Sequence, residues 1–208
     1  MSYYFLSDLH ISDNTPNINS LFLHFLQNKA PKSEGIFILG DLFEYWVGDT
    51  QACYKDIINE FNKLYKLGVK LYFIPGNRDF LITQTFLNDF NLIKLPDPYK
   101  IVLNNISIII SHGDLFCIND KKYILFRKIV QNKLVKFLFL NLPLKLRLKI
   151  GTKLRVLSAK SSVKKNNIIM DVNKDYINQY LNKNKSQYII HGHTHKPGFN
   201  IINNKNHF

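Results

Sequence analysis

The sequence predicts an α/β fold. Short runs of large apolar residues alternate with stretches whose apolar residues recur at helical spacing, and residues 3–80 follow the order β-α-β-α-β. Crossover helices of this kind join parallel strands. Five of the apolar runs also end abruptly in polar residues, and the carboxyl ends of strands are where open α/β sheets bind ligands. We therefore expect the functional residues at these strand ends.

The first half of the chain contains three strands and two amphipathic helices. Ile36–Leu39 is the clearest strand because four large apolar residues lie between two glycines. The second helix ends at Gly68, a residue suited to a helix C-cap. In chain order, the expected elements are strand Tyr3–Ser7, helix Ile18–Asn28, strand Ile36–Leu39, helix Tyr54–Leu67 and strand Val69–Ile74.

The second half changes character. After a short helix at about 83–90, Lys100–Leu103 and Ile106–Ile110 predict a hairpin over Asn104 and Asn105, at which the sheet turns antiparallel. Helical patterns fill residues 119 to about 182, and a strand follows at Gln187–Ile190. A last strand is expected near Phe199–Ile202, where it leaves an exposed sheet edge.

Charge singles out the helical segment. The net charge is +13, and half of the 28 basic residues lie between Lys121 and Lys165, where there is no Asp or Glu. A basic surface suits nucleic acid, an anionic membrane or an anionic substrate. The bland alternative is a helical hairpin whose leucines pack on the core and whose lysines are solvated.

Length and composition favour one domain over residues 1–208, with a helical insertion at about 119–182 inside it. Cys53 and Cys117 lie far apart, so neither a disulfide framework nor a CxxC metal site is indicated. No signal peptide is visible, and the longest apolar run, 137–144, is far short of the roughly 20 residues that a spanning helix needs. We expect a cytoplasmic protein.

The five strand ends carry metal-type ligands. They are Asp8-Leu9-His10, Gly40-Asp41, Gly76-Asn77-Arg78-Asp79, Ser111-His112-Gly113-Asp114 and His191-Gly192-His193-Thr194-His195. Oxygen and imidazole donors without thiolates suit Mn²⁺, Fe²⁺ or Zn²⁺. Each motif alone is more typical of a solvated loop, but together they predict a two-metal site, in which one carboxylate bridges ions about 3.5–4 Å apart.

These motifs resemble the pattern DxH, GDxx(D/E), GNxx, a histidine after a strand, and GHxH, which is typical of calcineurin-like metallophosphoesterases. The resemblance implies a four-layer α/β/β/α sandwich. It also implies that one ion is held by Asp8, His10, Asp41 and His195, and the other by Asp41, Asn77, His112 and His193. Asp41 is then the shared ligand and a catalytic residue.

Arg78 stands where many phosphomonoesterases of this family have a proton-donating histidine. A guanidinium cannot act as a general acid at neutral pH, but it can stabilise charge on phosphoryl oxygens. The substitution favours a reaction whose leaving group needs no proton, such as cleavage of a diphosphate.

The motifs around Asp41, Arg78, Asp114 and Asp171 together resemble the UDP-2,3-diacylglucosamine diphosphatases. That resemblance implies Mn²⁺-dependent attack on the α-phosphorus in lipid A biosynthesis, giving UMP and 2,3-diacylglucosamine 1-phosphate. It also implies a peripheral place on the cytoplasmic side of the inner membrane, no nucleic-acid partner, and a helical lid for a nucleotide-linked glycolipid. The implied substrate contacts are Asn77, Arg78, Asp120, Ser158, Ser162, Lys165 and His193.

Two of the implied substrate contacts, Ser162 and Lys165, differ from the pattern of that family or depend on the register of the comparison. Ser162 replaces an asparagine of that family, and Lys164 takes the place of Lys165 if the register shifts by one residue. Two other functions stay open from the residues alone. One is a two-metal nuclease or phosphodiesterase that uses the basic surface, and the other is a metal-free scaffold with the same fold.

Overall fold

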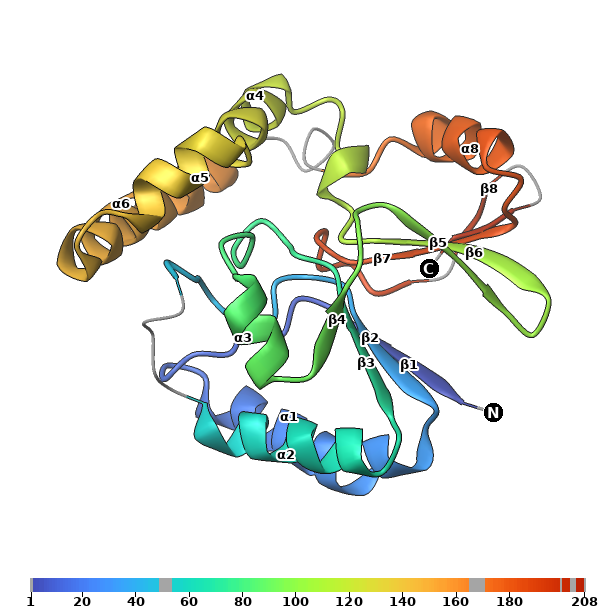
Figure 1. Ribbon diagram of the computed structural model, residues 1–208. Coiled ribbons are helices and arrows are strands. Elements are labelled where there is room, and N and C mark those ends of the chain that lie inside the picture. The colour runs from blue at the N-terminus through green and yellow to red at the C-terminus, as the bar shows by residue number, and fades with distance from the viewer. Residues whose placement is uncertain (1, 49–53, 165–170, 199, 203–204, 208) are drawn as a thin grey trace. The chain divides into compact units, whose positions relative to one another are not determined.

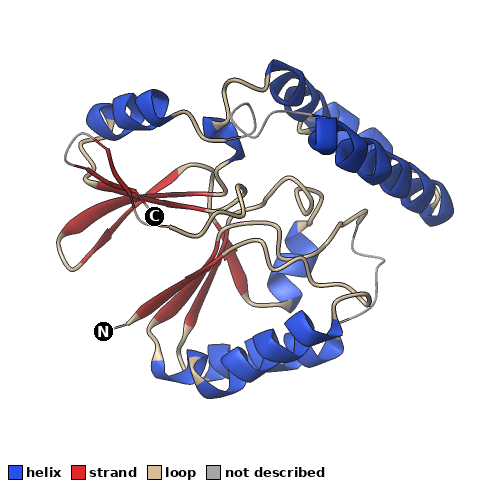
Figure 2. Ribbon diagram, turned by 180° about the vertical axis from the view of Figure 1, so that it is seen from behind, coloured by secondary structure: helices blue, strands red, loops and turns tan. Residues whose placement is uncertain are grey.

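The computed structural model describes residues 2–48, 54–164, 171–198, 200–202 and 205–207. The chain divides into two compact units, Met1–Asp97 and Pro98–Phe208. Each unit combines one β-sheet with helices, as Figures 1 and 2 show. The α/β class expected from the sequence is therefore confirmed, and the units supply two separate sheets. The expectation of one domain with an inserted segment stays a prediction.

The first unit is built on a parallel sheet. Its strands are β1 (Tyr3–Leu6), β2 (Gly35–Ile38), β3 (Lys70–Phe73) and β4 (Leu92–Lys94), paired in that order. The parallel pairing of the first three strands agrees with the β-α-β-α-β pattern. The sequence pattern missed β4, whose three residues are too few to show a period. All four residues of β2 are buried, as its continuous apolar run predicted.

Helices α1 (Pro16–Asn28) and α2 (Lys55–Lys66) lie side by side along this sheet (Figure 1). α1 begins two residues before the expected start, because the fixed φ of Pro16 suits the first turn of a helix. Phe22 and Phe61 meet edge to face at 6.1 Å between ring centroids and join the two helices in the core. The remaining helical elements are the 3₁₀ turn η1 (Ala30–Lys32) and α3 (Gln84–Asp89).

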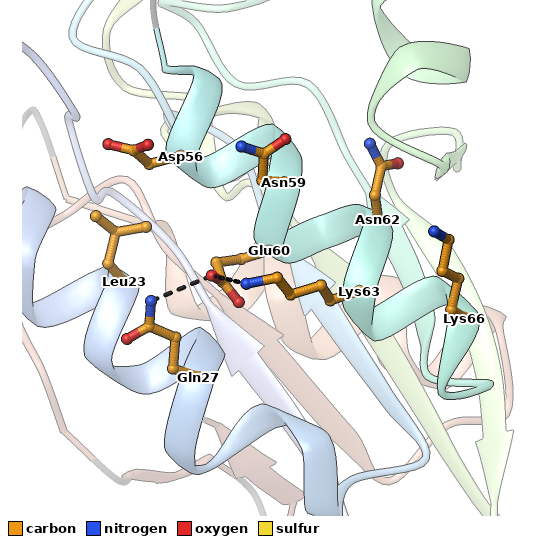
Figure 3. A pocket seen from close by; sticks show the side chains of 8 residues that line it. All are labelled: Leu23, Gln27, Asp56, Asn59, Glu60, Asn62, Lys63 and Lys66. Atoms are coloured by element: carbon orange, nitrogen blue, oxygen red, sulfur yellow. Dashed lines mark hydrogen bonds and ion pairs between the residues drawn. The ribbon is translucent and has the colours of Figure 1, made fainter.

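A polar groove runs between α1 and α2 (Figure 3). Glu60 lies at its base and accepts hydrogen bonds from Gln27 Nε2 at 3.1 Å and Lys63 Nζ at 2.8 Å. The bond from Lys63 is the main reason why the pKa of Glu60 falls below its ordinary value. The groove is lined by residues of α1 and α2, and none of the predicted metal ligands is among them. We therefore assign it no part in the predicted site.

The second unit has a mixed sheet with the strand order β5-β6-β7-β9-β8. Strands β5 (Tyr99–Leu103) and β6 (Ile106–Ser111) form the expected hairpin, with Asn104 and Asn105 in the left-handed conformation. We expected the first sheet to continue here and turn antiparallel, and this was wrong. The hairpin pairs with no strand of the first sheet, and it begins a second sheet directly after the prolines at 96 and 98.

The second sheet is completed by three strands. β7 (Tyr188–His191) is parallel to β6, and β8 (Asn200–Ile202) forms a hairpin with β9 (Lys205–His207). β9 pairs with β7, so β8 lies at the edge of the sheet. The sequence pattern missed β9, because its three residues contain no large apolar side chain.

Helix α8 (Lys174–Lys183) packs on this sheet through Ile177 and Leu181, which join Ile109 and Ile189 in a buried cluster. It begins at Lys174, because the Asn173 side chain caps it by accepting from the backbone N–H of Tyr176 at 2.9 Å. The short turn η2 (Asp114–Phe116) follows β6 and adds Phe116 to the cluster.

Three helices make up the first part of the expected insertion: α4 (Lys121–Val130), α5 (Lys133–Leu140) and α6 (Leu144–Lys164). α4 and α5 contact each other. Neither α4 nor α5 contains a fully buried residue, and Leu134 and Phe137 are each 64% exposed. Within the described residues, no helix is both long and apolar enough to cross a membrane.

Candidate metal centre

The loops that follow β1 and β2 lie side by side beyond the ends of their strands. Asp8 N–H donates to Gly40 O at 3.1 Å, and His10 N–H donates to Asp41 O at 3.0 Å. An isolated parallel bridge between Ile11 and Phe43 continues the pairing. The backbone therefore fixes Asp8, His10 and Asp41 relative to one another.

The side chains of these three residues converge. His10 Nε2 lies 3.9 Å from Asp8 Oδ1 and 4.0 Å from Asp41 Oδ2. Asp8 offers a ligand atom within 4.8 Å of one from His10 and of one from Asp41. Asp41 is only 2% exposed. Two carboxylates at this distance repel each other unless a positive charge lies close by.

Arg78 supplies one such charge from the loop after β3. Its Nε lies 3.5 Å from Asp41 Oδ2, and its backbone N–H donates to Asp41 Oδ1 at 2.9 Å. Its Nη1 donates to Glu44 Oε1 at 3.2 Å, while the other oxygen of Glu44 lies 3.3 Å from His10 Nδ1. Glu44 thus bridges the guanidinium and the imidazole and fixes the orientation of both.

Asp79 connects the loops after β2 and β3 from inside the protein. It is fully buried, and its two carboxylate oxygens accept from Gly76 N–H at 2.6 Å and Leu42 N–H at 2.8 Å. A Cβ atom at Gly76 would collide with the Asp41 carboxylate, so this position requires glycine. Asn77 lies between these fixed positions and is half-buried.

The second unit brings two of its three predicted ligands together. His112 directly follows β6 and is fully buried. Its ring lies 5.0 Å from the ring of His193 in an edge-to-face arrangement. The backbone joins their loops, because Gly192 N–H donates to His112 O at 3.0 Å. His195 is exposed, and the next residue, Lys196, pairs with Asp171 at 2.7 Å.

The backbone at the predicted ligands is strained. Five of the seven adopt left-handed conformations although none is glycine: Asp8 (φ 55°), His10 (49°), Asp41 (52°), His193 (73°) and His195 (52°). Such conformations cost of order 1–3 kcal/mol each and concentrate at functional sites. Among the described residues, the others that are left-handed and not glycine are Tyr54, Asn91, Asn104, Asn105 and Lys185, which lie in turns or at helix ends.

The predicted substrate contacts of the second unit lie on the helical insertion. Asp120 is buried and caps α4, because its Oδ1 accepts from Tyr123 N–H at 3.1 Å. Ser158 is exposed on α6. Ser162 belongs to the same helix, but its side chain lies outside the described residues, as does the whole of Lys165.

The residues of each unit fit divalent cations. Asp8, His10 and Asp41 form a cluster of oxygen and imidazole donors in the first unit, and His112 and His193 form an imidazole pair in the second. Hard oxygen and borderline nitrogen donors of this kind suit Mn²⁺, Fe²⁺ and Zn²⁺.

Residues 1–197 match the family model of the calcineurin-like phosphoesterases, and the chain belongs to this family. It is 42% identical over 207 residues to UDP-2,3-diacylglucosamine hydrolase of Histophilus somni (strain 2336), covering 99% of this chain and 88% of that protein. The protein of the same name from Pasteurella multocida (strain Pm70) is 43% identical, with 96% of this chain and 84% of that protein covered. The protein of the same name from Wigglesworthia glossinidia brevipalpis is 41% identical, and the match covers 99% of this chain and 84% of that protein. The resemblance drawn from the motifs is confirmed.

The sequence motifs contain Asp79 and Asp114, and Glu44 follows Asp41 by three residues, but the motifs indicated no role for these carboxylates. Glu44 orients His10 and Arg78, and Asp79 connects two loops. The available signal was their place within three residues of the predicted ligands Asp41, Asn77 and His112. Tyr123 and Arg127, described below, carried no signal of this kind, because they lie in an ordinary amphipathic pattern.

Proposed function

We propose that this protein hydrolyses the diphosphate of UDP-2,3-diacylglucosamine to UMP and 2,3-diacylglucosamine 1-phosphate, a step of lipid A biosynthesis. The observation that carries the proposal is the position of Arg78, whose guanidinium is held against Asp41 and Glu44 at the strand ends. Curated relatives at about 40% identity over nearly the whole chain carry the corresponding hydrolase name. Together they favour a diphosphate over other phosphoesters.

The proposed metal ligands are Asp8, His10, Asp41, Asn77, His112, His193 and His195, with Asp41 shared by two ions, most simply Mn²⁺. Two divalent cations would polarise the phosphoryl oxygens and activate water. The burial of Asp41 and His112 supports this assignment, because low solvent access strengthens electrostatic interactions with the phosphate. The strained backbone at five of these residues also supports it.

Arg78 is the proposed catalytic cation. The bond broken in this reaction joins the α-phosphorus to an oxygen that leaves as a sugar 1-phosphate, a weakly basic group that needs no proton donor. Arg78 is about one-third exposed, with Glu44 holding one of its terminal nitrogens at 3.2 Å. The guanidinium is therefore oriented in advance, and it can stabilise the charge that develops on the phosphoryl oxygens.

The helical insertion is proposed to hold the acyl chains and to contact the anionic cytoplasmic face of the inner membrane. Its helices expose apolar side chains beside basic ones, with Leu125, Leu134, Phe137 and Leu138 all more than half exposed. Basic amphipathic helices bind anionic lipid surfaces in this way. Asp120, Ser158, Ser162 and Lys165 are the proposed head-group contacts, with Asn77, Arg78 and His193 from the loops.

A direct assay tests the proposed function. Purified protein with Mn²⁺ should release UMP from UDP-2,3-diacylglucosamine, and a chelator should abolish the release. The same preparation should cleave bis(p-nitrophenyl) phosphate and single-stranded DNA far more slowly. Faster cleavage of either of these substrates, with no UMP release, would establish the nuclease or phosphodiesterase alternative instead.

A further inference from the structure

A buried carboxylate connects the insertion to the predicted histidine ligands of the second unit. Asp114, two residues after His112, is 1% exposed. Its Oδ2 accepts a hydrogen bond from Tyr123 Oη at 2.6 Å and another from Arg127 Nε at 2.6 Å. Both donors come from α4, the first helix of the insertion. One buried oxygen therefore holds two residues, spaced one helical turn apart, on the same face of α4.

The contacts of Asp114 pair its buried carboxylate with a positive charge. The Arg127 guanidinium lies 2.6 Å from Asp114 Oδ2, and Arg127 is itself largely buried. A buried carboxylate paired to a guanidinium in this way resists separation, because either charge alone would be left poorly solvated. The contact therefore fixes α4 more firmly than an exposed ion pair would.

The same helix reaches the second predicted ligand directly. The ring of Tyr123 lies 5.8 Å from the ring of His193, which in turn lies 5.0 Å from the ring of His112. The Tyr123 backbone is also fixed, because its N–H donates to the side chain of Asp120, which caps the helix. Tyr123 is thus held at its backbone and at its hydroxyl, with its ring against an imidazole.

We propose that Asp114, Tyr123 and Arg127 form a latch that sets the orientation of His112 and His193 by fixing α4 against their loops. The three are positioning residues for the proposed diphosphatase, on which this inference rests. The consequence is a coupling: movement of the insertion, as when a lipid enters or leaves, is transmitted to the metal ligands through Tyr123. Release of the latch would loosen the imidazole pair and the insertion together.

The test compares Tyr123→Phe and Asp114→Asn with Tyr176→Phe, a matched control in the same unit. Tyr123→Phe removes one hydroxyl and keeps the ring, so the protein is expected to fold. Asp114→Asn keeps the shape and removes the charge. For each variant, Mn²⁺ is titrated into metal-free protein by calorimetry, amide hydrogen exchange is followed over residues 121–130, and UMP release is measured per folded molecule.

We expect both latch variants to weaken Mn²⁺ binding and lower kcat/KM about tenfold, the usual effect of losing a hydrogen bond to a charged group, and to speed exchange in α4. The double variant should lose less than the two single variants predict by addition, since Tyr123 and Asp114 share one hydrogen bond. If Mn²⁺ affinity and turnover per folded molecule stay within twofold of the parent, the latch is purely structural and the proposal is wrong. If no variant, nor the parent, releases UMP while Mn²⁺ affinity still falls, the proposed function fails and the latch stands.

Discussion

The loops after β1, β2 and β3 differ from the helical insertion in what they bury and what they expose. In the loops, the charged side chains Asp41 and Asp79 are buried and satisfied by backbone N–H groups. In helices α4 and α5, large apolar side chains are left in solvent. Burying charge and exposing hydrocarbon both cost free energy relative to the reverse arrangement. Each region is therefore less stable than it could be. The buried carboxylates of the loops and the exposed apolar side chains of the helices point to different roles.

Buried, hydrogen-bonded carboxylates indicate a site that fixes individual atoms. The loops after β1, β2 and β3 do this with paired backbones, left-handed residues and, at Gly76, a glycine that leaves room for a carboxylate. Exposed apolar side chains on a basic helix indicate a surface for a large, variable apolar partner. Substitutions in the loops should therefore change chemistry with little tolerance, whereas substitutions of the exposed apolar side chains of the insertion should change association and leave folding intact.

The largest expected effect follows from changing Asp41 in the loop region. Asp41→Asn removes the proposed bridging charge and should lower UMP release more than about 100-fold, since even partners of ligands often contribute 10–100-fold. Steady-state kinetics at saturating Mn²⁺ measures the effect. Asp13→Asn, an exposed aspartate of the same unit, is the control and should match the parent. Near-parental turnover of Asp41→Asn would refute the shared-ligand assignment.

Arg78→Ala should lower kcat by about 100-fold, as the loss of one group that stabilises transition-state charge does. Mn²⁺ affinity, measured by calorimetry, should change far less, because the guanidinium is not a ligand. Arg78→Lys keeps the charge but cannot contact Asp41 and Glu44 at once, so it should recover only part of the activity. An equal loss of metal affinity and turnover would make Arg78 a structural residue.

The insertion should respond in the opposite way. Replacing Phe137 and Leu138 with serine should reduce binding to anionic vesicles by at least about tenfold, because two exposed apolar side chains no longer enter the lipid. The midpoint of urea unfolding should hardly move, since neither side chain is buried. Leu21→Ser changes an equally exposed leucine of α1 and should leave vesicle binding unchanged. If it lowers binding as much, the insertion is not the lipid-binding region.

The smallest expected effect is at Cys117, in the buried cluster of the second unit. Burial raises the pKa of this thiol to about 12, so almost none of it is thiolate at pH 8 and reaction with a thiol reagent should be very slow. A Cys53→Ser variant leaves Cys117 as the single cysteine. Colorimetric labelling of this variant should appear only after unfolding in urea. Rapid labelling of the native protein would show that the cluster around Cys117 opens readily.

Much of the fold could be predicted because its signals are local. The apolar run of β2, the asparagine turn between β5 and β6 and the helix stop at Gly68 each arise within a few residues. The errors arose where pairing decides the outcome. A short strand such as β4 or β9 exists because an existing edge offers hydrogen bonds, and the division into two sheets depends on which edges remain unpaired after residue 97.

The candidate site shows the same division. The ligand types and their place after apolar runs could be predicted from the sequence, because metals prefer particular donor atoms and strand ends expose them. The sequence had no means of showing that Glu44 bridges His10 and Arg78, or that Asp114 holds two residues of α4. Those contacts join residues that are 9 to 34 positions apart, and no periodicity relates them.

The sequence by itself determined the α/β class, the family and the chemical nature of the predicted ligands, since these depend on residue type and on spacing along the chain. Only the tertiary structure decided which carboxylates are buried, which ligands adopt left-handed backbone, and which partners orient them. The physical reason is that burial, strain and hydrogen bonding belong to a position in space. A residue acquires them only when distant segments of the chain pack around it.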